Sequence, residues 1–260
     1  NQLSQCIDSL MKTRCYHPIR IIVVNNGERH LDHDTPSDDI VFIKTPHNLG
    51  WTGGLIEGLK VSTSKYVLFM NDDTFVPWSS ASFIMDFVNI MEANTGIGMI
   101  GPSSNCVMGS QNMWYPYTPS DLFYAPFLVG FCQLVSREAL SLAGGIDPRF
   151  HTGDDIELSI RMRLAGYQLC VSHNHFIFHH GFQTGERIYG KPGLKGGWNS
   201  KEMNSQTRSS IIRKHGLRVW WDTMVKGFPV SFYPNYDIEG DTIRGLVDTM
   251  GKKILDIGAG

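Results

Sequence analysis

Two carboxylates and an amide follow directly after an apolar run in the first third of the chain. The run, residues 66–70 (YVLFM), predicts a strand buried on both faces, as in a mostly parallel sheet, and it ends on Asn71, Asp72 and Asp73. In open α/β sheets, ligands bind beyond the carboxyl ends of the strands. Carboxylate and amide oxygens placed there suit Mg²⁺ or Mn²⁺. A polar turn without function is the alternative interpretation, because Asn and Asp favour turns.

A second acidic group lies at the start of a helix predicted over residues 154–164. Of its acids, Asp154, Asp155 and Glu157, one is expected to cap the helix and the others to favour its positive end. Glu157 and Arg161 are four residues apart, so we expect them to pair on the surface. One carboxylate then has no structural role, and it suits a base that takes a proton from a bound hydroxyl.

Four histidines lie close together in the sequence, namely His173, His175, His179 and His180. If residues 175–180 form a strand, His175 and His179 lie on one face and His180 lies on the other. Some of the four are expected to be ordinary hydrogen-bonded histidines. A zinc site is disfavoured, because no cysteine lies nearby with the spacing of a zinc finger.

A glycine-rich stretch begins at Asn48 and leads into a helix predicted over about residues 54–63. Glycines such as Gly50, Gly53 and Gly54 let the backbone approach a ligand closely. The stretch is neither a G-x-G-x-x-G motif nor a P-loop, so by itself it does not identify a ligand.

Strands and helices alternate along the chain, which predicts an α/β domain. One amphipathic helix begins almost at residue 1. Further strands are expected at residues 20–26, 40–43, 97–100 and 128–135. Residues 168–172 and 175–180 are expected to form two strands or one broken strand, and helices are expected after Pro77, after Ser136, and at about 201–215 and 218–226. Residues 101–127 and 183–200 have no clear period, and loops of such length usually have a function or move.

Composition and charge are those of an ordinary globular protein. With 260 residues, the chain suits one large domain, or one domain and a fragment. A net charge of −2 gives no electrostatic support for a nucleic-acid partner. The 5 cysteines are scattered and form no C-x-x-C pair, which favours a reducing compartment. Since no apolar run is long enough to span a bilayer and no signal peptide is present, we expect a cytoplasmic protein.

Six segments occur in an order that resembles glycosyltransferase family 2, a group of GT-A-fold enzymes that includes bacterial rhamnosyltransferase-like members. The segments are VVNNG, NLGWTGGLIEG, LFMNDDT, GFCQLVSREALSLAGGID, GDDIELSIRMRLAGY and FIFHHG, and the resemblance covers about residues 1–215. It implies a Rossmann-like α/β fold with a mostly parallel mixed sheet flanked by helices. It also implies an inverting transfer of a sugar from a nucleotide-diphosphate donor of UDP or dTDP type, helped by Mn²⁺ or Mg²⁺. The acceptor would be a hydroxyl of a saccharide or lipid-linked molecule, as in polysaccharide biosynthesis for the cell envelope.

The resemblance assigns roles to single residues. Asp73 matches the metal ligand of the family's DXD-type motif, and Asp72 would lie against the ribose or the metal. His179 matches the histidine that closes the metal and pyrophosphate site, with His180 as the less favoured neighbour. Asp155 matches the catalytic base, and Asp154 stands where the family has Glu. The donor-binding positions implied are Asn25, Asn48, Gly50, Gly53, Gly54, Asn71 and Asp72.

Three features depart from the family pattern. Asn25 stands where many members have an Asp that accepts a hydrogen bond from uracil, so the base preference is open, although an amide oxygen still accepts. Glu57 stands where an Asn is common. The family's first strand, which helps to hold the nucleotide, would lie before residue 1.

The C-terminal end carries a second resemblance. Residues 252–260 (KKILDIGAG) predict a strand that runs into a glycine turn, similar to the first motif of class I S-adenosylmethionine-dependent methyltransferases. An ordinary strand that ends in glycines is the alternative. We therefore expect a glycosyltransferase domain over residues 1–226, and a linker with the truncated start of a methyltransferase domain over residues 227–260. A chain that stops at this loop is not expected to bind the cofactor.

Two other functions share some of these features. A nucleotidyltransferase also joins an α/β sheet to a metal and a nucleotide, but it needs a basic residue at the attacked phosphate, and no such signature lies near the glycine-rich stretch. A module that binds nucleotide sugars without catalysis is disfavoured by the presence of both Asp73 and Asp155. Basic residues between positions 187 and 226 form either a solvated helical surface or a contact with an anionic acceptor or the inner face of a membrane.

Overall fold

The computed structural model describes residues 2–27, 39–115, 122–181 and 200–225, together with residues 186 and 190. Predictions for the loop at 28–39, the loop at 183–200, the linker at 227–250 and the motif at 252–260 lie wholly or mostly outside these residues. The division of the chain at residue 226 therefore stays a prediction.

Helices and strands alternate along the described chain, as the sequence predicts. The helices are α1 (Gln2–Met11), α2 (Gly50–Val61), α3 (Phe83–Ala93), α4 (Arg137–Leu142), α5 (Asp154–Leu164), α7 (Lys201–His215) and α8 (Leu217–Met224). The strands are β1 (Ile21–Asn25), β2 (Ile40–Lys44), β3 (Tyr66–Met70), β4 (Thr74–Phe75), β5 (Ile97–Ser103), β6 (Phe123–Tyr124), β7 (Cys132–Ser136), β8 (Gln168–Phe176) and β9 (Phe178–His179). Two short 3₁₀ turns are η1 (Trp78–Ser80) and η2 (Gly109–Gln111).

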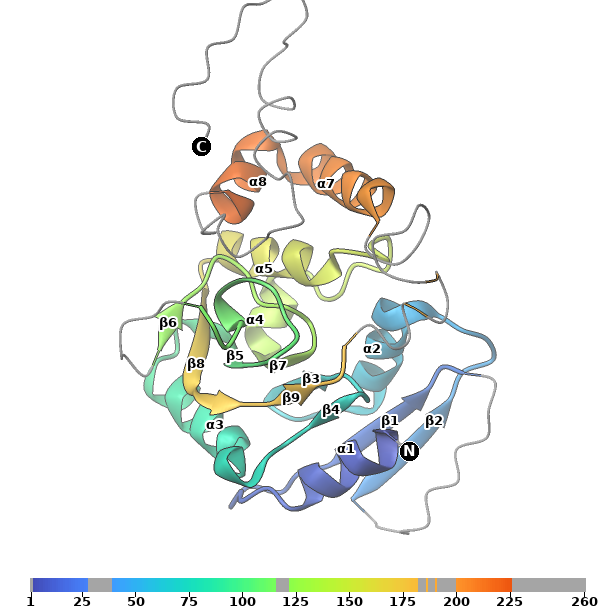
Figure 1. Ribbon diagram of the computed structural model, residues 1–260, viewed down its shortest axis with the longest axis vertical. Helices are drawn as coiled ribbons and strands as arrows, with labels where there is room; N and C mark the ends of the chain where they lie inside the picture. The colour runs from blue at the N-terminus through green and yellow to red at the C-terminus, as the bar shows by residue number, and fades with distance from the viewer. Residues whose placement is uncertain are drawn as a thin grey trace, which may run out of the picture.

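A mixed sheet in the order β3-β7-β5-β8-β6 forms the centre of the molecule (Figure 1). β5 and β8 pair in parallel, whereas β7 pairs antiparallel with β3 and β5, and β6 pairs antiparallel with β8. β1 and β2 form a separate parallel pair. β4 and β9 form a separate antiparallel pair whose register sets Thr74 opposite His179. The predicted α/β architecture is confirmed.

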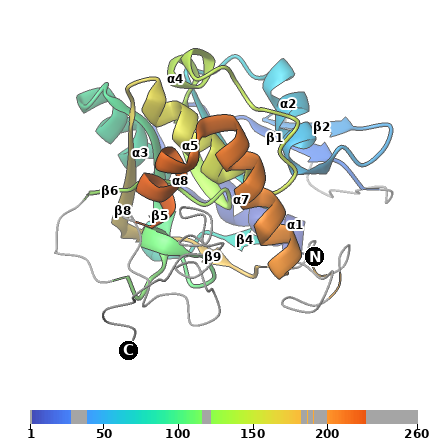
Figure 2. The same ribbon diagram turned by 90° about the horizontal axis from the view of Figure 1, so that it is seen from above.

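Apolar side chains on both faces of the sheet build the core, so helices cover the sheet from two sides (Figure 2). One face packs against α2, α4 and α5, through residues such as Val135, Leu140 and Met162. The other face packs against α3 and α1, with Phe83 and Phe87 fully buried. α7 and α8 form an outer layer whose apolar side chains pack on α5.

Residues 128–131 differ from the strand predicted over 128–135, because β7 begins only at Cys132. Three successive backbone N–H groups in this segment donate to side chains: Leu128 to Ser159 Oγ, Val129 to Gln111 Oε1, and Gly130 to Asp155 Oδ2. Because these donors are satisfied by side chains, the segment forms a turn instead of extending the ladder.

Two predicted helix starts also differ from the structure. α2 begins at Gly50, so most of the glycine-rich stretch lies inside its first turns. After Pro77 the chain makes the 3₁₀ turn η1, and α3 begins only at Phe83. The predicted helix over 154–164 is confirmed, and it is followed by Gly166 with a φ of 92°.

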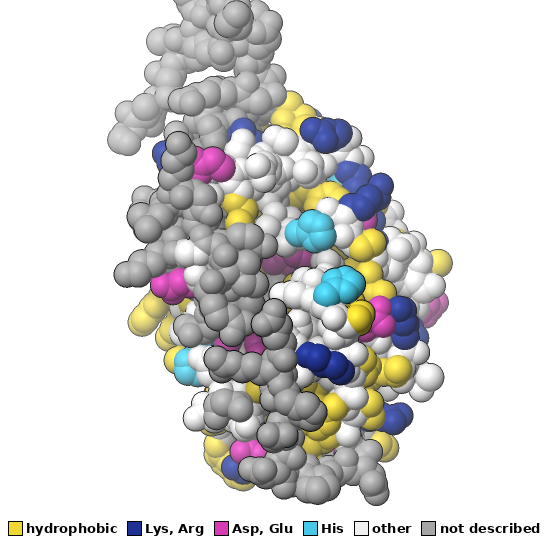
Figure 3. Space-filling view, turned by 90° about the vertical axis from the view of Figure 1, so that its right-hand side faces the viewer, with side chains coloured by type: hydrophobic (Ala, Val, Ile, Leu, Met, Phe, Trp, Pro, Cys, Tyr) yellow, Lys and Arg dark blue, Asp and Glu magenta, His cyan; other side chains and the backbone are white. Residues whose placement is uncertain are grey.

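The surface is mixed in charge. Acidic and basic side chains are interspersed on the face shown in Figure 3, and no extended area of one sign covers the visible, coloured part of it. This pattern agrees with the net charge of −2. None of the helices in the described ranges is both long and apolar enough to cross a membrane.

Candidate active site

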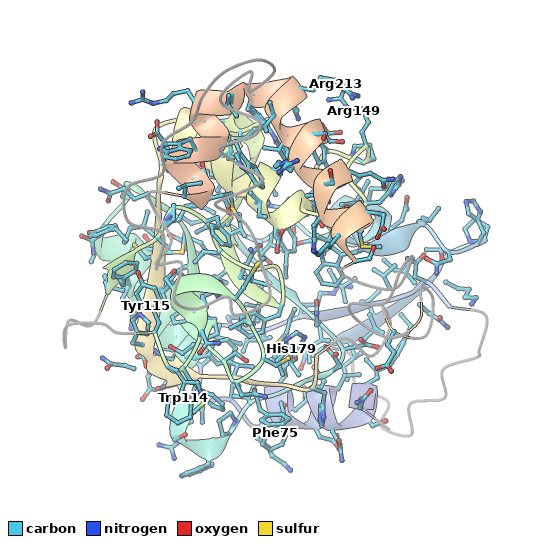
Figure 4. All side chains as sticks on the ribbon, turned by 45° about the horizontal axis from the view of Figure 1, so that its top comes forward. Phe75, Trp114, Tyr115, Arg149, His179 and Arg213 are labelled. Atoms are coloured by element: carbon cyan, nitrogen blue, oxygen red, sulfur yellow. The ribbon has the colours of Figure 1, made fainter. Side chains whose placement is uncertain are left out.

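Asp73 and His179 meet at the ends of two neighbouring elements. Asp73 lies between β3 and β4, and His179 ends β9, which pairs with β4. Nε2 of His179 lies 3.2 Å from Oδ1 of Asp73, and each side chain is only 10% exposed. The N–H of His180 donates to the carbonyl of Asp73 and holds the two segments together. His179 points toward the interior of the molecule (Figure 4), whereas Asp72 is exposed on the turn.

The partners of His179 decide which of its ring nitrogens carries hydrogen. Nδ1 lies 2.9 Å from the carbonyl oxygen of Cys106, which can only accept, so Nδ1 is the donor. In the neutral ring, Nε2 then presents a lone pair, and the side-chain amide of Asn71 lies 3.3 Å from it. Oδ1 of Asp73 is buried and has no hydrogen bond to any described residue. Two lone-pair atoms that face each other in this way suit a shared cation.

Asp155 is held by backbone hydrogen bonds on both carboxylate oxygens. Oδ2 accepts from the N–H of Gly130 at 3.0 Å, and Oδ1 accepts from the N–H of Ile156 at 2.8 Å. Burial raises the pKa of Asp155, and the two N–H groups oppose the rise. The carboxylate is therefore fixed in direction and more basic than that of a free Asp.

Asp154 lies beside Asp155 in the first turn of α5, and both line a small pocket together with Trp51 and Gln133. Burial, and then the charge of Asp155, raise the pKa of Asp154 well above its usual range. Asp154 and Asp155 are both half-buried, so each keeps some contact with solvent. The prediction that an Asp caps the helix is wrong, because the N-cap is Gly153, whose φ of 67° lies in the left-handed region.

The dipeptide Gly130-Phe131 connects the two groups of acids. The N–H of Gly130 holds Asp155, and the carbonyl of Phe131 accepts from the N–H of Asn71 at 2.9 Å. The Phe131 ring stacks on the His179 ring, with 5.2 Å between the centroids. The sequence reasoning missed this role, for which the one local signal is a glycine inside an apolar run.

Asparagine side chains shape the glycine-rich stretch. The Asn48 side chain accepts from the N–H of Gly50 at 2.8 Å, and Gly50 has a φ of 70°, which glycine adopts without strain. Asn26 donates to the carbonyl of Gly50 at 2.7 Å and accepts from the N–H of Leu49 at 2.8 Å. Asn26, which the sequence reasoning did not single out, therefore ties the end of β1 to the start of α2.

Some of the predicted donor residues also have structural partners of their own. The side-chain oxygen of Asn25 accepts from the N–H of Gly27 at 3.1 Å. A Cβ atom on Gly53 would lie 2.5 Å from the Cβ of Leu49, whereas one on Gly54 would meet its nearest described atom at 3.7 Å. Helix packing by itself therefore requires glycine at position 53, independently of any ligand.

The other histidines of the predicted cluster lie outside this group. His180 is exposed, in line with the alternation along the strand. His175 is buried between Ser172 and Asp86, with its ring nitrogens 2.8 and 3.0 Å from their oxygens. His173 bonds to a serine of β5. Within the described chain, no group of three or more His, Cys, Asp or Glu side chains is arranged to hold a metal.

Glu157 and Arg161 pair as predicted, but the pair is buried and not on the surface. The Glu157 side chain is 1% exposed, and Nε of Arg161 lies 2.8 and 2.9 Å from its two oxygens. Nζ of Lys214 and Nε2 of His215 lie 2.6 and 2.9 Å from Oε1 of Glu157. Burial would raise the pKa of Glu157, but the bonds from these three partners hold it below its ordinary value. Lys214, one of the predicted basic surface residues, lies at the surface and reaches this buried carboxylate with its Nζ.

The family model described as glycosyl transferase family 2 matches residues 1–141, which is more than half of the chain. The chain belongs to glycosyl transferase family 2. The matched part of this glycosyltransferase holds Asn25, the glycine-rich stretch, the acidic cluster after β3, and Gly130. Asp155 and His179 lie beyond the matched residues.

Solved structures share the fold of the glycosyltransferase. GalNAc-T7, solved with UDP, GalNAc and Mn²⁺, is 13% identical, with a TM-score of 0.56 over 85% of this chain and 46% of that chain. TarS of S. aureus is 11% identical, with a TM-score of 0.53 over 95% and 47%. The mannosyltransferase PcManGT of Pyrobaculum calidifontis, solved with GDP-Man and Mn²⁺, is 12% identical, with a TM-score of 0.52 over 96% and 77%. The predicted GT-A fold is confirmed, and the chain spans just under half the length of the first two structures.

Mycobacterial relatives match most of the glycosyltransferase. Uncharacterized proteins of Mycobacterium tuberculosis and Mycobacterium bovis are 27% identical to it over 235 residues, which cover 81% of this chain and 85% of theirs. These relatives extend the likeness beyond the residues of the family model. The methyltransferase-like motif at residues 252–260 stays a prediction.

Proposed function

We propose that this glycosyltransferase moves a sugar, with inversion at the anomeric carbon, from a nucleotide-diphosphate sugar to a hydroxyl of a saccharide or lipid-linked acceptor. The observation that carries the proposal is the buried Asp73–His179 pair, in which Oδ1 of Asp73 lacks a hydrogen bond and lies 3.2 Å from Nε2. Its place beyond the end of β3 is where α/β sheets bind their ligands.

Asp73 and His179 fit a divalent cation such as Mn²⁺ or Mg²⁺. They offer one carboxylate oxygen and one imidazole nitrogen, and such cations take further ligands from water and substrate phosphates. A cation bound there supplies Lewis-acid stabilisation of the charge on the departing diphosphate. Two of the solved relatives contain Mn²⁺ together with UDP or GDP-Man, which supports this class of ligand. Asn71 and Asp72, on the same turn, would contact the donor.

Asp155 is the proposed base. Its carboxylate is fixed by two N–H groups, and burial raises its pKa, so it is suited to take a proton from an acceptor hydroxyl. The acceptor oxygen forms a bond to the anomeric carbon while the bond from that carbon to the diphosphate oxygen breaks. The hydroxyl proton passes to Asp155, and the electron pair leaves with the diphosphate. One displacement of this kind inverts the anomeric centre.

The carboxyl end of β1 and the start of α2 are proposed to line the nucleotide of the donor. Asn25 ends β1, and its amide oxygen, which accepts from the N–H of Gly27, is the atom proposed to accept from a base of UDP or dTDP type. Asn48 and Gly50 form the adjacent turn, which the side chain of Asn26 holds in place.

Donor turnover tests the proposal. The protein is incubated with Mn²⁺ and a panel of radiolabelled sugar nucleotides, and the products are identified. Release of sugar and nucleoside diphosphate supports a glycosyltransferase, release of pyrophosphate indicates a nucleotidyltransferase, and binding without turnover indicates a binding module. A thermal-shift screen identifies the donor, because a ligand at a hundred times its Kd stabilises the folded state by about 2.7 kcal/mol. The absence of both turnover and a thermal shift with every donor tested would contradict the proposal.

A further inference from the structure

α7 lies against the turn that starts the helix of the proposed base. Oγ1 of Thr207 is 2.6 Å from Oγ1 of Thr152, two residues before Asp154. A Cβ atom on Gly153 would lie 2.2 Å from Cγ2 of Thr207, so Thr207 is in direct contact with Gly153. α7 therefore touches the residue that caps α5.

The C-terminal end of α7 presents two further groups to the acids behind the base. Nζ of Lys214 bridges Asp147 and Glu157, 2.6 Å from one oxygen of each. Nε2 of His215 lies 2.9 Å from the same oxygen of Glu157. Glu157 follows Asp155 by two residues on α5, so α7 holds this helix at its capping turn and again through its first turn.

One pocket is lined both by these acids and by Asp155, the proposed catalytic base, and its lining holds more acidic than basic side chains. Four carboxylates line it, with Arg161 as the cation among its lining residues; the four are Asp147, Asp154, Asp155 and Glu157. Like charges in a confined site oppose each other's ionisation. The titratable and charged groups that face this region in the described chain are the four acids and Arg149, Arg161, Lys214 and His215. Arg149 pairs with Asp147 and Arg161 pairs with Glu157, whereas Lys214 lies between these two acids and bonds to both.

We propose that α7 supports the active site, and that Lys214 is a positioning residue that acts on Asp155 through Glu157 and Asp147. The inference rests on the proposed function, since it takes Asp155 as the base. Lys214 keeps the first turn of α5 against the Gly130 turn and balances the acid charge behind the base. α7 lies outside the residues that match the family model, so membership of the family does not assign this role.

Loss of the Lys214 charge is expected to slow transfer without weakening donor binding. Lys214→Met keeps most of the side-chain length, and its kcat should fall about fivefold or more, while the KM for the donor stays within about twofold. Removing a cation near carboxylates raises their pKa, so the acidic limb of the pH profile of kcat should move up by roughly half a unit. Lys214→Arg, which keeps the charge and can bridge both carboxylates, should restore both quantities.

Arg213→Met is the matched control. Arg213 is the neighbouring cation on α7, is exposed, and lies with Arg149 at the outside of the molecule (Figure 4). Its replacement should leave kcat and the pH profile unchanged. If Lys214→Met does not fold, Lys214→Gln, which keeps a donor but no charge, takes its place.

A carboxyl titration separates this inference from the proposed function. The ¹³C signal of the Asp155 carboxyl, assigned with Asp155→Asn, should titrate at higher pH in Lys214→Met than in the wild type, whether or not a donor is turned over. A wild type without turnover contradicts the proposed function, and the titration still decides the role of Lys214. Any of three results overturns the inference. The pKa of Asp155 could be equal in Lys214→Met and the wild type, an active Lys214→Met could keep the wild-type kcat and pH profile, or Arg213→Met could lose as much activity as Lys214→Met.

Discussion

At the scale of single residues, the two candidate groups differ in how their oxygens are satisfied. Oδ1 of Asp73 is buried without a hydrogen bond, whereas both oxygens of Asp155 accept from backbone N–H groups. A buried acceptor without a partner costs roughly 1–3 kcal/mol, which a bound cation can recover. A bonded carboxylate with a raised pKa keeps its direction and still accepts a proton. The surroundings of Asp73 therefore favour binding, and those of Asp155 favour proton transfer.

We expect Asp155→Asn to separate catalysis from folding. The amide cannot take a proton, so transfer should fall at least roughly a hundredfold, while binding of donor and Mn²⁺ persists. The amide keeps one of the two backbone hydrogen bonds, so the variant should melt within a few degrees of the parent. Wild-type transfer by a folded variant would make Asp154 the next candidate for the base.

The same variant tests the pKa of Asp155. Burial raises this pKa in the folded state, so ionisation destabilises the fold as pH rises from the unfolded pKa through the folded one. The melting temperature of Asp155→Asn relative to the parent, measured by calorimetry, should therefore increase as pH rises above about 4, the ordinary pKa of Asp. A difference in melting temperature that does not change with pH would show that the pKa of Asp155 is not shifted.

We expect His179→Ala to impair metal-dependent activity far more than His180→Ala. His179 is buried and directs Nε2 at Asp73, whereas His180 is exposed. Titration calorimetry with Mn²⁺ and a nucleoside diphosphate measures the loss of binding, and Asp73→Ala removes the other ligand as a positive control. The reverse order of the two histidine variants would show that the opposite face of the strand binds the metal.

At the scale of elements, turns and not helix interiors decide where the candidate residues lie. The turn at residues 128–131 leaves the sheet because its N–H groups bond to side chains, and one of these is Asp155. The turn before α5 ends on Gly153 in a left-handed conformation, directly under Thr207 of α7. The turn before α5 needs glycine, because Gly153 has a positive φ and a Cβ there would meet Thr207.

Gly153→Ala is expected to cost more stability than Gly145→Ala. Both glycines have positive φ, 67° and 73°, so each Ala carries about 1–2 kcal/mol of left-handed strain. A Cβ on Gly153 would lie 2.2 Å from Cγ2 of Thr207, whereas one on Gly145 would meet no described atom within 4 Å. Denaturant unfolding measures both losses, and Thr207→Ala should recover part of the loss at Gly153. Equal losses would contradict a close contact between α7 and the turn.

At the scale of the whole molecule, α7 and α8 attach to the α/β core through an apolar patch, the Thr152–Thr207 hydrogen bond, and the bonds of Lys214 and His215 to Asp147 and Glu157. The apolar contact does not depend on pH, but the ionic contact does. Acid should therefore loosen this outer layer before it affects helices on the other face of the sheet, such as α3 (Figure 1).

Hydrogen exchange in acid tests this order. Burial alone would raise the pKa of Glu157, but the bonds from Arg161, Lys214 and His215 outweigh this effect, so the pKa lies below its ordinary value. A lowered pKa contributes stability that is present above the unfolded value and is lost as pH falls through the folded value. Exchange of α7 amides, corrected for the intrinsic rate, should speed up relative to α3 below about pH 4. Glu157→Gln should weaken this dependence, and equal acceleration of α3 and α7 would contradict it.

The basic stretch at residues 187–226 stays a proposed contact with an anionic acceptor or membrane surface. Of its described cations, Lys214 and Arg218 already pair with acids, and charges of both signs are interspersed on the face in Figure 3. Co-sedimentation with anionic vesicles should therefore be weak and should disappear near 0.15 M salt, at roughly an 8 Å Debye length. Neutral vesicles are the control, and no binding at low salt removes the membrane proposal.

Patterns over a few neighbouring residues were enough to predict the alternation of strands and helices, the acidic turn after β3, and the helix at 154–164. These features depend on side-chain period, caps and turn residues, which are local properties of a sequence. The family resemblance, and not a local pattern, singled out His179 and Asp155. The charge pattern also predicted the Glu157–Arg161 pair, but it could not tell that α7 buries it.

Only the tertiary structure decided which side chains meet. The pairing of β4 with β9 brings His179 to Asp73, and a backbone N–H 25 residues away orients Asp155. Asn26, Phe131 and Lys214 acquire their roles in the same way, through partners that are distant in sequence. Such contacts follow from how layers pack and how strands register, and residue spacing along one element carries no information about either.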